Sequence, residues 1–395
     1  MFNVFSRAQA LSIGVSPNRH TAAVGCCLGR LEPGVFEVRA ACARTEHAWA
    51  TTFVDRPDLV EKRMDMSAGE IAHDTELALA TTSGRLLVAR SFREHDVIAL
   101  GTAATLHGLP RDAATRKLQV FHPKDAVKRA GLVRSQRPVP LEHRIAVSFT
   151  ASGGAVDGPH EVTTAARTVA DLVRRDLVTG FIALEAFLAT ETPFATVDSS
   201  FRDVGSPNAV HIDGSRGATP SAPDAHQLLS PGSEGLIVPG TRSWARHPLD
   251  EGVRRSRWRA VSDVLEHECF ARHPAHVPLV MQWAHGLSGS WYEAKAAIVF
   301  RLLGMHNVVQ QFEVVDSSGK LIARPDFRIE GTHFTVEFDG RIKYQDLTKQ
   351  WRSRTFEKEK LRDAHLMADA VRSPQVFAYY LRESRVPVPV PVPVP

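Results

Sequence analysis

The sequence predicts an α+β protein made of several domains. Its 395 residues are enough for two or three domains that each bury a core. Two short helices and a hairpin are expected at its start, and a helix, three strands, a helix and a strand near its end. A stretch rich in Gly, Pro, Ser and Asp separates these parts and is the expected linker.

Composition excludes several classes of protein. A hydrophobic fraction of 43% with a charged fraction of 23% is ordinary for a globular chain and too apolar for wholesale disorder. No apolar run approaches the ~18 residues of a membrane span, and the start of the chain lacks the pattern of a secretory signal. We therefore expect a cytoplasmic protein without a membrane partner. The net charge of +4 is mild, so any nucleic-acid role must depend on local basic clusters.

The cysteines also favour a cytoplasmic protein. The chain has four, which form neither a CxxC pair nor a regular spacing: Cys26, Cys27, Cys42 and Cys269. Neither a disulfide framework nor a four-cysteine zinc site is expected from this pattern, and a reducing environment follows.

Residues 1–45 are expected to form a winged-helix head. Ser6 can cap a first helix, and Gly14 stands where that helix would end. A second helix is expected from about Pro17 to Leu28, and residues 29–38 suit a short hairpin. A helical pair followed by a hairpin is what a winged-helix module needs.

Three segments are expected between the head and the last domain. Residues 46–92 form a connecting elaboration with helical stretches and a strand-like segment at 85–89. Residues 93–190 suit a small α/β module with helices at 98–107, 163–173 and 181–189. Residues 191–260 form the linker, which ends in a basic run at 254–259 that contains Trp258.

Residues 261–385 form the expected last domain. The expected elements are a helix at 291–303, strands at 308–315, 324–329 and 333–339, a long charged helix at 345–370 and a strand at 375–381. The tail at 386–395 is a Val-Pro repeat that favours extended polyproline II.

The strongest chemical signal in this last domain is a group of carboxylates. Side chains alternate along a strand, so Glu337 and Asp339 share one face of the strand at 333–339. Asp326 lies a hairpin's reach away, and Glu293 on the preceding helix can add a fourth carboxylate. Because neighbouring carboxylates repel one another, this group favours a hard divalent cation such as Mg²⁺ between them, with Mn²⁺ as the other candidate.

Basic residues follow the carboxylates at once. Residues 341–362 hold eight Lys or Arg against three Asp or Glu. Carboxylates for a metal beside cations for phosphate are what a metal-dependent nuclease needs. We take the following as candidate DNA-binding residues: Arg341, Lys358, Lys360 and Arg362 in this segment, Arg19 and Arg30 in the head, and Arg257 in the basic run.

Pro325-Asp326 followed by Glu337-Phe338-Asp339-Gly340 resembles the PD-(D/E)xK nuclease superfamily, in the branch related to very-short-patch-repair endonucleases. The segments at 288–293, 308–314 and 357–363 resemble that branch's helix start, first strand and basic helix, so the resemblance covers about residues 285–382. It implies a restriction-endonuclease-like fold.

The resemblance also implies roles for single residues. Asp326 and Glu337 would hold the metal, Asp339 would assist and Glu293 would complete the site. The superfamily pattern has a lysine two residues after the glutamate, where this chain has Asp339. Lys343 and Lys358 are the candidates for supplying that cation.

A second resemblance concerns the first half of the chain. Phe5–Leu11, Gly14 and Leu31–Phe36 resemble the winged-helix head of abortive-infection type IV antitoxins, and 101–110 and 162–172 are similar to their next module. The resemblance implies a head that binds operator DNA, and a nucleotidyltransferase toxin as partner. It also implies the fusion of this head to a nuclease-like domain that is found in actinobacterial chains.

Two functions follow from these patterns. The leading one is a Mg²⁺-dependent endonuclease acting on DNA in repair or phage defence. The alternative is an antitoxin-like DNA-binding regulator whose nuclease-like domain is inactive. A zinc site formed by His267, Cys269, His273 and His276 is disfavoured, because the spacing matches no common finger and a helix would splay these side chains. No feature of the sequence sets an oligomeric state.

Overall fold

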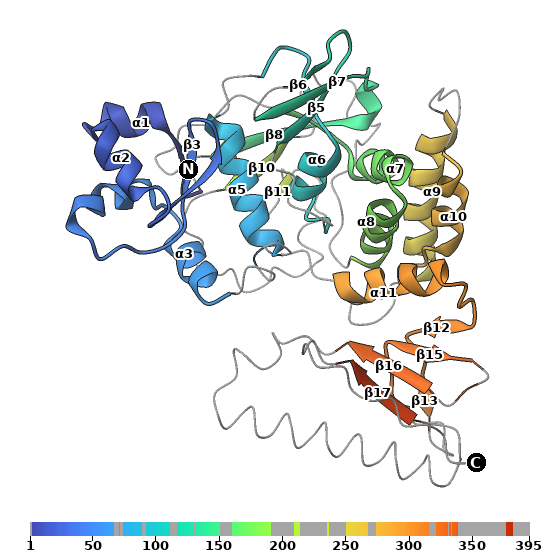
Figure 1. Ribbon diagram of the computed structural model, residues 1–395. Helices are drawn as coiled ribbons and strands as arrows, with labels where there is room; N and C mark the ends of the chain where they lie inside the picture. The colour runs from blue at the N-terminus through green and yellow to red at the C-terminus, as the bar shows by residue number, and fades with distance from the viewer. Residues whose placement is uncertain are drawn as a thin grey trace. The chain divides into compact units, whose positions relative to one another are not determined.

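The computed structural model divides the chain into two compact units, Met1–Gly286 and Leu287–Pro395 (Figure 1). Both units contain helices and strands, so the α+β class is confirmed. No helix of the part described is long and apolar enough to cross a membrane. The structure describes residues 2–66, 71, 74–88, 92–110, 117–128, 131–150, 160–190, 209–213, 235–236, 250–267, 274–315, 321–330, 332, 334–338 and 377–381.

The first unit begins with a small three-stranded sheet and two helices. The elements are β1 (Val4–Ser6), α1 (Arg7–Ser12), α2 (Pro17–Ala23), β2 (Leu28–Glu32) and β3 (Val35–Val38), and the antiparallel sheet has the order β1-β3-β2. Ser6 caps α1 in a capping box with Gln9, and Ser16 caps α2. Side-chain caps of this kind satisfy the free N–H groups of a helix start, which explains why both helices begin there.

The second helix is shorter than its sequence suggests. It ends at Ala23 rather than at Leu28, because Gly25 takes a φ of 84° and turns the chain. The N–H of Gly25 donates to the carbonyl of Leu28 at 3.0 Å, which closes the turn. Cys26 and Cys27 therefore lie in a tight turn before β2 and not on a helix.

Aromatic side chains form the core of this head. A 3-10 helix, η1 (Thr45–Phe53), packs its Phe53 ring on Phe5 with centroids 4.2 Å apart. His20 of α2 lies edge-on to Phe36 at 4.3 Å and is almost fully buried. Because aromatic rings bury large areas, this cluster holds the two helices, the hairpin and η1 together.

The buried His20 makes the stability of the head depend on pH. Burial lowers the pKa of His20 below its usual value of 6.5, and the charge of Arg7 lowers it further. Near and below pH 6.5 the imidazole of His20 therefore takes up a proton more readily in the unfolded chain than in the folded one. The free energy of unfolding should thus decrease as the pH falls through 6.5. We expect His20→Leu to flatten this dependence in urea unfolding between pH 5 and 8. An equally steep pH dependence in the variant would contradict the assignment.

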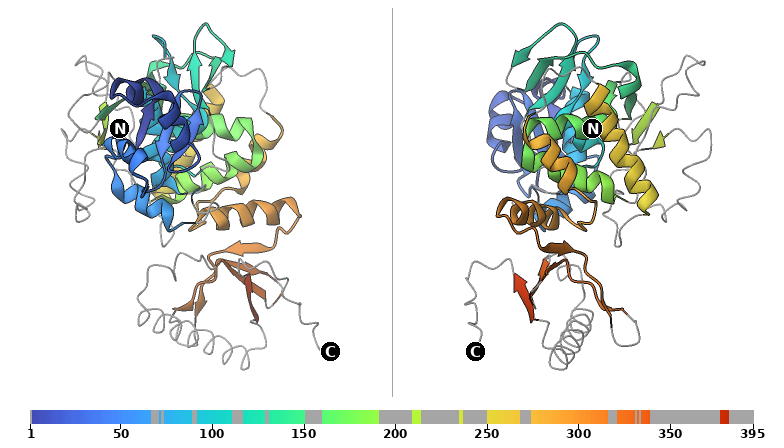
Figure 2. Two further views of the ribbon diagram at one scale, coloured as in Figure 1. Left: turned by 60° about the vertical axis from the view of Figure 1, so that its left-hand side comes forward. Right: turned by 90° about the vertical axis from the view of Figure 1, so that its right-hand side faces the viewer.

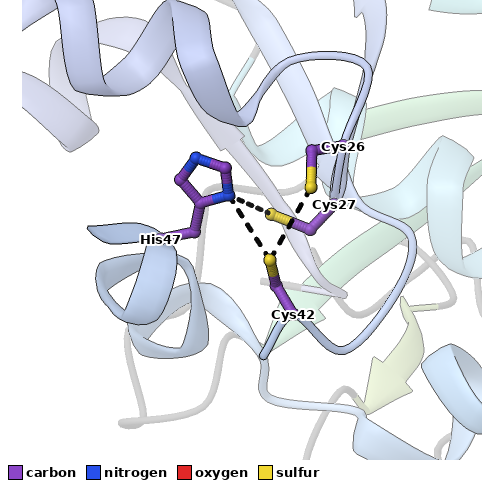
Figure 3. A group of neighbouring side chains, drawn as sticks. All are labelled: Cys26, Cys27, Cys42 and His47. Atoms are coloured by element: carbon purple, nitrogen blue, oxygen red, sulfur yellow. Dashed lines mark hydrogen bonds between the residues drawn. The ribbon is translucent and has the colours of Figure 1, made fainter. Parts of the chain in front are cut away.

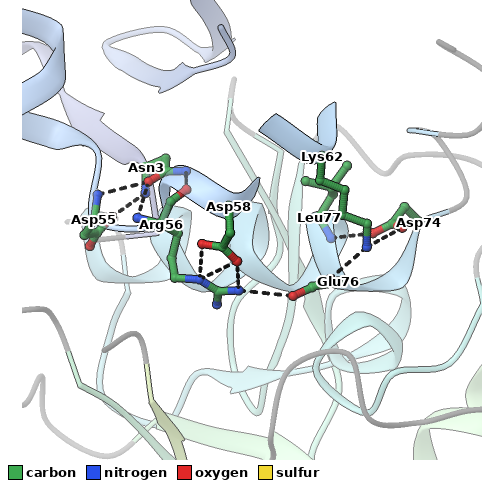
Figure 4. A network of polar contacts seen from close by, with 8 residues as sticks. All are labelled: Asn3, Asp55, Arg56, Asp58, Lys62, Asp74, Glu76 and Leu77. Carbon is green, nitrogen blue, oxygen red and sulfur yellow. Dashed lines mark hydrogen bonds and ion pairs between the residues drawn. The ribbon is translucent and has the colours of Figure 1, made fainter. Parts of the chain in front are cut away.

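The connecting segment is tied to the start of the chain by polar contacts (Figure 4). Asp55 accepts the backbone N–H groups of Phe2 and Asn3, and the Asn3 side-chain oxygen accepts the N–H of Arg56 at 2.8 Å. The Arg56 guanidinium then pairs with Glu76 at 3.1 Å. These contacts join β1 to the helices α3 (Pro57–Met64) and α5 (Thr75–Val88).

The strand-like interpretation of residues 85–89 is wrong, because Arg85 to Val88 form the last turn of α5. Leu77, Ala80 and Gly84 are buried along that helix. This spacing of three and four residues is helical, and it extends the helix through the segment.

An eight-stranded mixed sheet occupies the middle of the first unit, in the order β11-β10-β8-β9-β4-β5-β7-β6. The strands are β4 (Val97–Ile98), β5 (Leu118–His122), β6 (Val127–Lys128), β7 (Leu132–Gln136), β8 (Arg144–Thr150), β9 (His160–Thr163), β10 (Ala209–Asp213) and β11 (Gly235–Leu236). The short 3-10 helix η2 (Leu141–His143) precedes β8. The strands β10 and β11 come from the expected linker, which therefore contributes to the sheet. The strand β10 pairs parallel with β8, and β11 pairs parallel with β10.

Helices accompany this sheet. They are α6 (Leu100–Leu106), α7 (Ala165–Arg175), α8 (Leu177–Ala189), α9 (Glu251–His267) and α10 (His276–Trp283). The green helices α7 and α8 lie beside the gold helices α9 and α10 in Figures 1 and 2. The helices α9 and α10 lie in the first unit, which ends at Gly286, whereas the expected last domain begins at residue 261. His107, expected at a helix end, caps α6.

The helix α7 carries a buried ion pair at i, i+4 spacing, formed by Arg167 and Asp171. The side chains of Arg167 and Asp171 are 0% and 1% exposed, and their Nε and Oδ2 atoms are 2.8 Å apart. Arg137 also pairs with Asp171, at 2.6 Å. Spacing alone cannot tell a buried helix face from an exposed one when the neighbouring helices are unknown.

The second unit consists of a helix and a sheet. It comprises α11 (Trp291–Leu302), β12 (Val308–Gln310), β13 (Val314–Val315), β14 (Leu321–Ala323), β15 (Phe327–Ile329), β16 (Phe334–Phe338) and β17 (Phe377–Leu381). The main sheet has the order β12-β15-β16-β17, in which β16 and β17 are parallel, and β13 and β14 form a separate pair. The expected helix at 345–370 and the Val-Pro tail lie outside the described residues.

Candidate functional site

The strands β15 and β16 bring two of the predicted carboxylates together. They pair antiparallel with Phe327 opposite Val336 and Arg328 opposite Thr335. The same register, continued by one residue, sets Asp326 opposite Glu337. Residues opposite each other in an antiparallel pair share a face, with Cβ atoms about 4.5–5.5 Å apart. Because Phe327 and Val336 are buried on the other face, Asp326 and Glu337 lie on the face away from that core.

Glu293 is held at the start of α11. Its carboxylate accepts the N–H of Gly289 at 2.7 Å, the hydroxyl of Ser290 at 2.9 Å and the side-chain amide of Gln311 at 3.2 Å. A Cβ at position 289 would lie 3.3 Å from both carboxylate oxygens, so glycine allows this close approach. Glu293 is nearly buried, and these donors compensate its charge.

Gln311 connects Glu293 to Asp326. Its side chain donates to Glu293, and its backbone N–H donates to the carbonyl of Asp326 at 2.9 Å. Its φ of 52° is a strained conformation for a residue with a side chain, and such strain often accompanies functional sites. No role is expected for Gln311 from the sequence, because the spacing of residues along the chain does not reveal either contact.

The carboxylates do not form a closed ligand set on their own. Among the described residues, no cluster of converging donor atoms contains Glu293, Asp326 and Glu337 together. The other residues predicted for this site lie outside the described residues: Asp339, Arg341, Lys343, Lys358, Lys360 and Arg362. Carboxylate oxygens are the type of donor that Mg²⁺ and Mn²⁺ prefer, so the donor type suits such a cation although the described carboxylates do not converge on one point.

The basic run at 254–259 lies within α9 and holds part of the first unit together. Arg257 donates to the carbonyls of Phe187 and Thr190 at 2.8 and 2.7 Å, and burial lowers the pKa of its guanidinium. Trp258 donates its indole N–H to Met281 at 3.1 Å. Both side chains thus connect helices of the first unit, which does not favour the role predicted for Arg257 in binding DNA.

The two candidate DNA-binding residues of the head are exposed. Arg19 lies on α2 and Arg30 on β2, and neither forms an ion pair with any residue that the structure describes. The Arg19 guanidinium donates to the backbone carbonyl of Glu46 at 3.1 Å. Both charges are therefore accessible to a partner.

Sequence analysis missed a second cluster, formed by Cys26, Cys27, Cys42 and His47 (Figure 3). One donor atom from each residue lies within 4.8 Å of the other three. The signal was the adjacent cysteine pair followed by Cys42 and then, five residues later, by His47. The spacing of these residues matches no common zinc motif, so the sequence alone does not single them out.

The disfavoured histidine cluster receives no support from its described members. His267 contacts the carbonyl of Asp263 at 2.8 Å, and His276 contacts that of Val173 at 2.8 Å. Cys269 and His273 lie outside the described residues.

Comparison of the chain with protein-family models, curated proteins and solved structures finds no match.

Proposed function

We propose that the second unit is a nuclease-like domain that hydrolyses phosphodiester bonds of DNA with Mg²⁺, or with Mn²⁺ in its place. The observation that carries the proposal is the register of β15 and β16, which sets Asp326 opposite Glu337. Two carboxylates on one face repel each other, and a divalent cation relieves that repulsion. The resemblance of this segment to the PD-(D/E)xK superfamily supports the same function.

The chain's own residues would bind and orient the reacting groups. Asp326 and Glu337 would hold the cation, which polarises a phosphoryl oxygen and lowers the pKa of a bound water. Gln311 fixes the backbone of Asp326, and Glu293 fixes the side chain of Gln311. Asp339 and Lys343 directly follow β16 in the sequence, and their assisting roles remain predictions.

A nicking assay tests this function. The full chain is incubated with supercoiled plasmid DNA in Mg²⁺, Mn²⁺, Ca²⁺ or excess chelator, and the nicked and linear forms are separated on a gel. We expect cleavage in Mg²⁺ and Mn²⁺ and none in chelator. Linear and mismatched duplexes in the same assay define the substrate. Intact plasmid in every metal, at protein concentrations that retain DNA, would reject the nuclease and favour the regulator.

A second candidate function, sequence-specific DNA binding by the head, is favoured by a different observation. The helices α1 and α2 are followed by the β2–β3 hairpin, as the proposed winged helix requires, and Arg19 and Arg30 are exposed on α2 and β2. Exposed arginines on a short helix and a hairpin can contact phosphates or base edges. In this case the chain would act as an antitoxin-like regulator, with a nucleotidyltransferase toxin as the implied partner.

The head makes a separate prediction about salt dependence. If Arg19 and Arg30 contact phosphates, Arg19→Ala and Arg30→Ala should each weaken DNA binding and reduce the slope of log K against log salt by about 0.9. Fluorescence anisotropy with a labelled duplex at several salt concentrations measures this slope. Arg255→Ala, which removes an exposed arginine of α9, is the matched control. Equal slopes in all three variants would exclude the two head arginines from the interface.

A further inference from the structure

The head contains four soft donor atoms that converge on one point (Figure 3). The Sγ atoms of Cys26 and Cys42 are 3.7 Å apart, and Nδ1 of His47 lies 3.4 Å from the Sγ of Cys42 and 3.9 Å from that of Cys27. All four donors lie within 4.8 Å of one another. None of these residues belongs to the carboxylate site of the second unit.

The three distances lie within about 0.4 Å of the edges of one coordination tetrahedron. Zinc bonds of about 2.3 Å to sulfur and 2.0 Å to nitrogen require two sulfurs about 3.8 Å apart and a sulfur about 3.5 Å from a nitrogen. Three thiolates and one imidazole are a set that structural zinc sites use, whereas Mg²⁺ and Ca²⁺ prefer oxygen. We propose that Cys26, Cys27, Cys42 and His47 form a structural zinc site that binds one ion.

Three separate segments supply the ligands, and backbone contacts fix two of them. The turn at Gly25 presents Cys26 and Cys27, whose N–H groups donate to the carbonyl of Ala23 at 3.1 and 3.2 Å. Cys42 follows β3, and His47 lies in η1, where its N–H donates to the carbonyl of Arg44 at 3.0 Å. The donors of Cys26, Cys27 and His47 thus lie on segments that backbone hydrogen bonds hold in place.

The surroundings of the cluster suit bound thiolates. The backbone N–H of Arg44 donates to the sulfur of Cys42, and the ring of His47 contacts the same sulfur. The positive charge of the Arg44 side chain attracts a thiolate at Cys26. Hydrogen bonds and a positive charge of this kind compensate a site in which three thiolates outweigh the charge of a divalent ion.

Ligation at this place would fix how the head presents α2 and the hairpin. Cys26 and Cys27 join the end of α2 to the start of β2, while Cys42 and His47 lie beyond β3. One ion would thus fasten both ends of the β2–β3 hairpin to η1. Thiol-to-thiol hydrogen bonds are weak, so the thiols alone would hold these segments poorly.

Metal analysis of the full chain tests the proposal. The protein is purified without a polyhistidine tag and without chelator, and zinc is measured by inductively coupled plasma mass spectrometry. We expect about one zinc per chain in the wild type. Changing a residue that only hydrogen-bonds to a metal ligand already lowers metal affinity by about 10–100-fold. Cys27→Ser and His47→Gln change the ligands themselves, so each should lower the zinc affinity by at least that factor. Cys269→Ser, which changes the remaining cysteine, should retain the wild-type content.

A spectroscopic measurement covers variants that fail to fold. The wild-type chain is stripped of metal under reducing conditions and titrated with Co²⁺, and we expect the charge-transfer and d–d absorption of tetrahedral cobalt bound to thiolates. Added Zn²⁺ should abolish these bands. Absence of both zinc and the cobalt spectrum in the wild type would overturn the proposal. A disulfide between Cys26 and Cys42 would lower the mass of the metal-free chain by two hydrogens when reductant is left out. If that disulfide forms and the protein binds no Co²⁺, the proposal is also overturned.

Discussion

Asp326→Asn and Glu337→Gln should each abolish metal-dependent DNA cleavage, with a loss of at least about 100-fold. The register of β15 and β16 sets these carboxylates opposite each other. In the proposed site each would supply an oxygen ligand that the other could not replace. An amide keeps the shape of the side chain but loses the charge that binds Mg²⁺. Changes in the outer shell of metal sites already cost about 10–100-fold, so loss of a ligand should cost at least the upper end of that range.

The matched control for this prediction is Glu330→Gln. Glu330 is exposed one residue beyond β15, and its backbone contacts Asn307. Its change removes the same charge from the same unit without touching Asp326 or Glu337. Cleavage rates are measured at several Mn²⁺ concentrations, with circular dichroism to confirm folding. Cleavage by a folded Asp326→Asn variant at the rate of Glu330→Gln would remove Asp326 from the site.

Asp96→Ala should destabilise the first unit by about 3–5 kcal/mol, because it leaves a buried arginine without its main partner. Asp96 precedes β4 and accepts both Nε and Nη2 of Arg134 on β7, at 2.6 and 2.5 Å. The two side chains are 0% and 2% exposed, and their hydrogen bonds raise the pKa of Arg134. Since β5 lies between β4 and β7, this ion pair crosses a strand. The expected drop in melting temperature is roughly 6–20 °C.

Two further variants make this prediction specific. Arg255→Ala breaks a pair with Glu251 in which both side chains are more than half exposed, and it should cost no more than about 1 kcal/mol. The double variant Asp96→Ala with Arg134→Leu removes both buried charges, so it should be more stable than Asp96→Ala alone. Thermal unfolding followed by circular dichroism compares all three. A melting temperature of Asp96→Ala equal to that of Arg255→Ala would show that the buried pair is dispensable.

Local signals in the sequence were sufficient for much of the fold. Ser6 marks the start of α1 because a hydroxyl there satisfies free N–H groups, and Ser290 does the same for α11. Alternation along β16 correctly separates the buried Val336 from Glu337, since successive side chains point to opposite faces. These features depend on neighbours within a few residues.

Features that depend on distant contacts could not be predicted in the same way. The strand β10 pairs with β8 across a segment whose composition suggested only a linker. Arg167 and Asp171 are buried by elements that the i, i+4 spacing does not specify. The cysteine cluster was not predicted because its ligands come from three segments whose spacing matches no common zinc motif. The end of α2 before Gly25, whose φ is positive, was not predicted either.

The most direct test of the account is whether Asp326 and Glu337 bind a divalent cation. Electron paramagnetic resonance of free Mn²⁺ measures binding by the full chain, with the double variant Asp326→Asn, Glu337→Gln and the control Glu330→Gln alongside. We expect the wild type and the control to bind Mn²⁺ and to release it when Mg²⁺ is added. We expect the double variant to bind no Mn²⁺. Equal binding by the wild type and the double variant, or binding by neither, would contradict the account.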